Sequence, residues 1–82
     1  MKYLQVELRV FSGLEKYLSH KRFGEPVPVE LPEEATLRDL LQKMGIPEEQ
    51  VFTILVNGRH QSLDYIPGEG DRVSLFPPVG GG

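Results

Sequence analysis

The chain has no cysteine among its 82 residues. This absence excludes a disulfide framework, a thiolate nucleophile and a zinc site built from thiolates. It also fits a reducing compartment, so we expect a cytoplasmic protein. Positive charge is scarce as well, with 9 Lys and Arg against 12 Asp and Glu, which gives a formal charge of −3 at pH 7. Nucleic acids bind basic surfaces, and we therefore expect no nucleic-acid partner.

Long apolar runs are also missing. No stretch approaches the roughly 20 apolar residues that a membrane-spanning helix needs. Met1 and Lys2 lead directly into a predicted strand without a signal peptide, and we expect no membrane association. A chain of this length builds one small domain with a single core, which has no room for both a cofactor cavity and a catalytic cleft.

The sequence shows no cluster of metal-binding or catalytic side chains. His20 and His60 lie far apart and match no metal-ligand spacing, so a surface or partner contact is the better interpretation of each. The paired acids Glu33-Glu34 and Glu48-Glu49 are explained by favourable charge at helix starts. No glycine-rich phosphate loop occurs inside the chain. We expect no bound metal and no bound cofactor.

Alternation of apolar and polar residues predicts the first two strands. Residues 4–10 alternate regularly, which is typical of a strand with one solvated face. Phe11 follows in the outward register of that strand, where a polar residue is expected. Residues 27–31 alternate again, but Pro26 and Pro28 place this strand at a sheet edge because proline donates no ladder hydrogen bond.

The second half of the chain predicts a hairpin and a final strand. Residues 51–56 are rich in β-branched and apolar types and are followed by Asn57-Gly58, the strongest short hairpin signal. We expect residues 59–61 to form a short return strand. Residues 73–76 alternate as the last strand, which Pro77-Pro78 terminate because proline cannot continue a ladder.

One well-defined helix lies between these strands. Thr36 can cap its N-terminus, with Asp39 three residues on in a capping-box arrangement. Gly45 ends the helix and Pro47 prevents its continuation. The buried face is the stripe Leu37, Leu40, Leu41 and Met44.

This element order predicts an α+β domain. One amphipathic helix covers one face of one mixed sheet of four to five strands, as in the β-grasp or ubiquitin-like fold. In that fold the first and last strands are parallel neighbours, which would bring Phe11 and Phe76 side by side on the solvent face. An exposed aromatic pair indicates a partner site. We expect the domain to span residues 1–79 and a flexible tail to span residues 80–82.

The tail ends in Gly80-Gly81-Gly82. Glycine at a free terminus neither caps nor packs, so these residues add nothing to stability. They form a thin thread that ends in an unobstructed carboxylate. A narrow active site in another protein could admit such a thread, because no Cβ prevents close approach of the backbone.

Three segments carry a resemblance to a known family. The most specific is Gly70–Val79, GDRVSLFPPV, followed by the terminal Gly81-Gly82. The others are Asn57-Gly58 after a buried strand and the segment Glu30–Leu41. Together they resemble the MoaD family of sulfur carriers, within the MoaD/ThiS superfamily of ubiquitin-like proteins. The Pro-Pro pair and the long connection between the first two strands favour MoaD over ThiS, although a triple-glycine ending also occurs in ThiS-like proteins.

The resemblance implies a small, non-catalytic subunit of molybdopterin synthase. A MoeB-like adenylating enzyme would use ATP to activate Gly82, and a sulfur donor protein would supply the sulfur of a C-terminal thiocarboxylate. That group would donate sulfur to a pterin precursor on a MoaE-like large subunit, which carries the catalytic groups, for molybdenum cofactor biosynthesis. Gly81 and Gly82 are the reacting end. The expected partner-binding residues are Phe11, His60, Phe76, Pro77, Pro78, Val79 and Gly80.

Two other functions fit the same tail. The chain could be a ubiquitin-like modifier whose Gly82 is joined to lysines, or a sulfur carrier of another pathway, such as thiamine, cysteine or tRNA thiolation. Adenylation is common to all of these, so the tail by itself does not choose between them. The third alternative is a β-grasp interaction domain with an inert tail.

Overall fold

The computed structural model describes residues 2–11, 13–18 and 26–78 of the chain. Its elements, in chain order, are β1 (Tyr3–Val10), the 3₁₀ turn η1 (Leu14–Tyr17), β2 (Val27–Pro32), α1 (Leu37–Met44), the 3₁₀ turn η2 (Glu48–Gln50), β3 (Thr53–Val56), β4 (Arg59–His60) and β5 (Arg72–Phe76). The predicted strands and helix are all present, and β3 begins two residues later than the sequence indicated.

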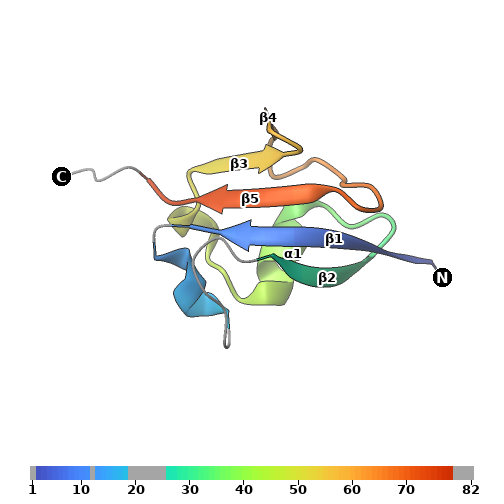
Figure 1. The fold of residues 1–82 in the computed structure, drawn as a ribbon, viewed down its shortest axis with the longest axis horizontal. Helices are drawn as coiled ribbons and strands as arrows, with labels where there is room; N and C mark the ends of the chain where they lie inside the picture. The colour runs from blue at the N-terminus through green and yellow to red at the C-terminus, as the bar shows by residue number, and fades with distance from the viewer. Residues whose placement is uncertain (1, 12, 19–25, 79–82) are drawn as a thin grey trace.

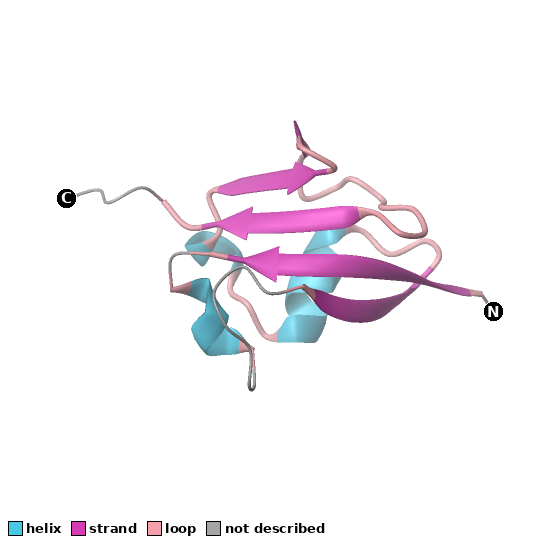
Figure 2. Ribbon diagram, in the orientation of Figure 1, coloured by secondary structure: helices cyan, strands magenta, loops and turns pink. Residues whose placement is uncertain are grey.

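The strands form one five-stranded mixed sheet in the order β2-β1-β5-β3-β4. The central pair, β1 and β5, is parallel, whereas the other neighbours are antiparallel. The helix α1 crosses one face of this sheet and leaves the other face open (Figure 1). Figure 2 shows the same two layers, with η1 and η2 near the end of the sheet where β1 and β5 finish. The α+β, β-grasp prediction is confirmed.

The ends of α1 follow the sequence prediction. The Asp39 N–H donates to Thr36 Oγ1 at 3.2 Å, and the Thr36 N–H donates to Asp39 Oδ2 at 2.9 Å. These reciprocal bonds are the predicted capping box, and they satisfy two donors that a helix start leaves without partners. Gly45 closes the helix with φ of +74°, a left-handed conformation that glycine adopts without a Cβ penalty.

A single apolar core lies between α1 and the sheet. Ten residues from the predicted strands and helix are buried in it, namely Leu4, Val6, Leu8, Val10, Leu37, Leu40, Leu41, Ile54, Val73 and Leu75. Leu14 and Leu18, around η1, are buried with them, which extends the core under the chain that follows β1. Met44, the last residue of the predicted stripe, is only partly buried against this core.

The loop before β5 holds the start of α1. The N–H groups of Leu37 and Arg38 donate to the carbonyls of Tyr65 and Leu63, at 2.9 Å and 3.0 Å. The Arg38 side chain donates from Nη1 to Asp64 Oδ1 at 2.7 Å. This hydrogen bond, with the charge of Asp64, raises the pKa of the Arg38 guanidinium above its ordinary value. The connection therefore packs on the helix rather than extending into solvent.

The open edge of β2 is protected against pairing with other strands. The Glu33 N–H donates to the Lys2 carbonyl at 3.1 Å, toward β1. Because successive N–H groups alternate in direction along a strand, positions 28, 30 and 32 of β2 face outward. Pro28 and Pro32 carry no N–H, so within Val27–Pro32 Glu30 presents the single outward donor. Prolines at such positions suppress edge-to-edge association.

The β3–β4 hairpin is tied to the start of β5. Asn57 and Gly58 have φ of +53° and +85°, as the type I′ turn of a tight hairpin requires. The Asn57 side chain accepts from the Arg72 N–H and donates to Asp71 Oδ1, both at 2.9 Å. Asp71 Oδ2 accepts from the Gly68 N–H at 2.8 Å. This network determines where β5 begins.

Candidate functional site

Two aromatic rings meet where β1 and β5 end. Val10 pairs with Leu75 in the parallel register, and the Phe11 N–H donates to the Leu75 carbonyl at 3.2 Å. The rings of Phe11 and Phe76 therefore stack, with centroids 4.7 Å apart and planes inclined by 5°. Both residues are half-buried. The structure thus places the predicted aromatic pair side by side.

Phe76 is the last residue that the sheet holds. Thr53 pairs with it, and the Phe52 N–H donates to its carbonyl at 2.8 Å. Pro77 and Pro78 follow and have no N–H to continue the ladder. The chain therefore leaves the sheet at Pro77, which is half-buried, while Pro78 is exposed. The stacked rings lie directly beside this exit.

His60 lies on the same face of the sheet as the aromatic pair. It pairs with Leu55, which in turn pairs with Ser74. The side chains of directly paired residues project from the same face of a sheet, so His60, Leu55 and Ser74 share a face. Side chains two residues apart along a strand also share a face, so Phe76 lies on the same side as Ser74. His60 is exposed, and three strand spacings, or about 14 Å, separate its strand from β1.

We call this side of the sheet, opposite α1, the open face. It includes the residues Glu7, Arg9, Phe11, Glu30, Thr53, Leu55, His60, Arg72, Ser74 and Phe76. Three of the predicted partner residues therefore share one surface, although they come from three separate parts of the sequence. The pattern of alternation predicts which way each side chain points, but it does not predict which strands are neighbours.

Three charged side chains occupy the middle of the open face. Arg9 donates from Nε to Glu7 Oε2 at 3.0 Å, and its Nη2 lies 2.9 Å from the same oxygen. Arg72 approaches that oxygen from the neighbouring strand, with Nε at 3.6 Å. One carboxylate therefore faces two guanidinium groups.

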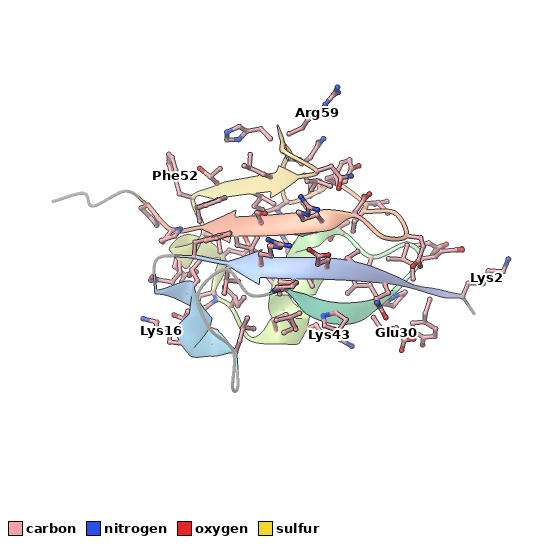
Figure 3. The ribbon with its side chains drawn as sticks, in the orientation of Figure 1. Lys2, Lys16, Glu30, Lys43, Phe52 and Arg59 are labelled. Carbon is pink, nitrogen blue, oxygen red and sulfur yellow. The ribbon has the colours of Figure 1, made fainter. Side chains whose placement is uncertain are left out.

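Phe52 is a surface residue that the sequence analysis missed. It lies in the range predicted as strand, but β3 begins one residue after it, so Phe52 stays outside the core with 71% of its surface exposed. Figure 3 shows it at the end of the sheet where β5 finishes. The sequence signal that could have identified Phe52 is an aromatic residue just before the start of a strand. Because its N–H donates to the Phe76 carbonyl, Phe52 lies next to the point where the chain leaves the sheet.

The remaining predicted site residues, Val79, Gly80, Gly81 and Gly82, lie outside the described residues, and their roles stay predictions. Within the described ranges, no group of three or more His, Asp or Glu side chains could hold a metal ion. The same part of the chain contains no helix that is long and apolar enough to cross a membrane.

Replacing Phe76 with serine should weaken binding to a MoeB-like or MoaE-like partner without unfolding the domain. The ring is half-buried on the open face and outside the core, so its loss removes an apolar contact surface and the stack with Phe11. Calorimetric titration with each partner would measure the change.

A matched control is Tyr3→Ser. Tyr3 is an exposed aromatic in the same outward register of β1, eight residues and about 26 Å from Phe11. We expect this variant to bind as the wild type does. Unchanged affinity of the Phe76 variant for both partners would show that the aromatic pair is not a docking surface.

The sequence matches the family described as Mut7-C ubiquitin over residues 3–80. No curated protein matches it significantly. Among solved structures it is similar to a putative molybdopterin converting factor, subunit 1, from Pyrococcus furiosus, with 28% identity and a TM-score of 0.70, covering 93% of this chain and 99% of that one.

Two further structures have the same fold. SAMP1 from Haloferax volcanii is 27% identical with a TM-score of 0.69, covering 95% of this chain and 99% of that one. A chain of the complex of subunits 1 and 2 of molybdopterin-converting factor from Helicobacter pylori is 26% identical with a TM-score of 0.57, covering 96% and 100%. The chain is thus similar both to molybdopterin-converting factor subunits and to SAMP1.

Proposed function

Because the chain belongs to the Mut7-C ubiquitin family, a family of ubiquitin-like β-grasp proteins, we propose that it is a sulfur carrier. Its C-terminal Gly82 is converted to a thiocarboxylate that donates sulfur as the small subunit of a molybdopterin synthase. The observation that carries the proposal is the stacked pair Phe11 and Phe76, which lies beside the point where β5 releases a tail ending in glycine. A partner that docks on the rings receives the tail.

The chemistry requires activation, because a free carboxylate is a poor electrophile. Attack of the Gly82 carboxylate on the α-phosphate of ATP forms an acyl-adenylate and releases pyrophosphate. A persulfide on a donor protein then attacks the acyl carbon and AMP leaves, which forms an acyl disulfide. A second thiol cleaves the S–S bond, becomes oxidised to a disulfide with the donor, and frees the thiocarboxylate.

The catalytic groups for these steps belong to the partners. ATP is bound by a MoeB-like adenylating enzyme, and the sulfur acceptor is bound by a MoaE-like large subunit. Similarity to a chain of the Helicobacter pylori complex of subunits 1 and 2 supports the second partner. The function of this chain is to present its tail.

The length of the tail limits where a partner can react. Six residues, 77–82, follow the last residue held by the sheet. At about 3.3 Å per extended residue they span at most about 20 Å. The reacting centre of each partner therefore lies within about 20 Å of Phe76 when the partner is docked. A cluster of catalytic groups farther from the docking site would be out of reach.

Intact-mass measurement tests the proposal directly. The protein is incubated with ATP, a cognate MoeB-like enzyme and a sulfide source. We expect the chain to gain the mass difference between sulfur and oxygen, located on its C-terminal peptide and dependent on ATP. A chain that stays unmodified in the complete mixture would contradict the proposal.

The second candidate function is protein modification. This candidate is supported by the similarity to SAMP1. The name stands for small archaeal modifier protein 1. In this case the activated Gly82 is transferred to the amino group of a lysine rather than to sulfur. Isopeptides between Gly82 and lysines of other proteins, detected by peptide mass spectrometry in cell lysate, would favour this function.

A further inference from the structure

The middle of the open face has a charge opposite to that of the whole chain. The charged residues there are Arg9 and Arg72 against the single acid Glu7, which leaves a net charge of +1 (two positive and one negative). The complete chain carries −3. Two further acids lie at Gln5, one pleat repeat farther from the rings, where Glu30 pairs with Gln5 across the edge strand and Glu69 Oε1 accepts from the Gln5 N–H at 3.0 Å. The positive charge is therefore local.

Arg72 is the residue of this group that can bind a partner. Its side chain is 59% exposed, compared with 33% for Arg9 and 38% for Glu7. Arg9 already donates to Glu7 Oε2, whereas Arg72 lies 3.6 Å from that oxygen, beyond hydrogen-bond distance. Within the described part of the chain, the Arg72 guanidinium makes no side-chain hydrogen bond. Its planar fork matches a carboxylate in a bidentate geometry.

We propose that the open face recognises a protein surface that carries both a carboxylate and an apolar recess, and that Arg72 binds this carboxylate while Phe11 and Phe76 fill the recess. The inference rests on the proposed function, because the partner is the adenylating enzyme that activates Gly82. Phe76 lies four positions after Arg72 in β5, so the carboxylate lies about 13 Å from the recess along the strand direction.

Glu7 distinguishes this role from a purely structural one. If Arg72 serves only to neutralise Glu7, then removing the charge of Glu7 leaves partner binding unchanged. If Arg72 binds the partner, Glu7 is an internal competitor for the same guanidinium, and Glu7→Gln should strengthen binding. The two roles therefore predict different results for one substitution.

The test is calorimetric titration of four variants with the cognate MoeB-like enzyme, without ATP, at low and high salt. We expect Arg72→Glu to weaken binding about tenfold or more, because a like charge then faces the partner carboxylate. Arg72→Lys should retain most of the affinity, and Glu7→Gln should raise it severalfold. Wild-type affinity should fall with salt more steeply than that of Arg72→Glu.

Lys43→Glu is the matched control, since it makes the same charge change on an exposed residue of α1, on the covered side of the sheet. It should bind as the wild type does, and thermal melts should show that all variants are folded. Equal effects of Arg72→Glu and Lys43→Glu, or weaker binding by Glu7→Gln, would overturn the inference. A wild-type chain that binds but gains no sulfur would contradict the proposed function alone, and one that does not bind would overturn both.

Discussion

Adding one residue after Gly82 should reduce sulfur charging by roughly a hundredfold or more. The reacting carbon would move by about one residue length, ~3.5 Å, from the α-phosphate of ATP, and displacements of even ~1 Å can cost about a hundredfold in rate. The measurement is the rate of mass gain with ATP, a cognate adenylating enzyme and a sulfide source. This is the largest effect that we expect from any single change.

The matched control is an extension of one residue before Met1. It adds the same mass at the other end of the chain, and Figure 1 shows the two ends of the described chain at opposite ends of the sheet. This variant should gain sulfur at the wild-type rate. A C-terminally extended chain that is charged equally fast would show that the free Gly82 carboxylate is not the reacting group.

Gly81→Val examines the same tail without changing its length. A β-branched side chain restricts the backbone and adds bulk next to the reacting carboxylate. We therefore expect sulfur charging to fail while the binding affinity, which we propose depends on the open face, stays near that of the wild type. Loss of binding together with loss of charging would mean that the tail itself contributes most of the docking energy.

The largest expected loss of stability follows Leu40→Ala. Leu40 is completely buried at the centre of the apolar face of α1, against the sheet. Its truncation removes buried methyl groups and leaves a cavity, which costs about 2–5 kcal/mol. A small domain is stable by only about 5–15 kcal/mol, so a large part of the folding free energy would be lost. Urea denaturation of the wild type and the variant gives the difference.

Gln42→Ala is the control for this helix. Gln42 lies on the exposed side of α1, where alanine removes no buried contact and has a good helix propensity. The free energy of unfolding should change by less than about 0.5 kcal/mol. A change that small for Leu40→Ala would be inconsistent with the packing of α1 on the sheet.

Local patterns in the sequence were sufficient to predict the elements of this fold. Thr36 and Asp39 cap a helix through bonds between residues three apart, and Asn57-Gly58 form a turn through their own φ angles. Such features depend on neighbouring residues only, so they can be recognised without knowledge of the rest of the structure. The β-grasp prediction then required only the order of these elements and the resemblance of the segments quoted above.

The structure starts β3 later than the sequence predicts. The apolar residues 51–56 predict one strand, but the 3₁₀ turn η2 occupies Glu48–Gln50 and β3 begins only at Thr53. Phe52 is left exposed beside the exit of the tail. Hydrophobic character alone does not distinguish a strand residue from one just outside the strand, because pairing with β5 determines where the ladder begins.

Only the tertiary structure decided how the candidate site is assembled. The outward register of Phe11 and Phe76 could be predicted from alternation, but their stacking depends on the parallel register of β1 and β5. His60 lies on the same face because β4 pairs with β3 and β3 pairs with β5. Arg72 of β5 lies beside Glu7 of β1 because these two strands are neighbours. These contacts join residues far apart in the sequence. Alternation predicts the face on which each side chain lies, whereas strand pairing determines which side chains meet there.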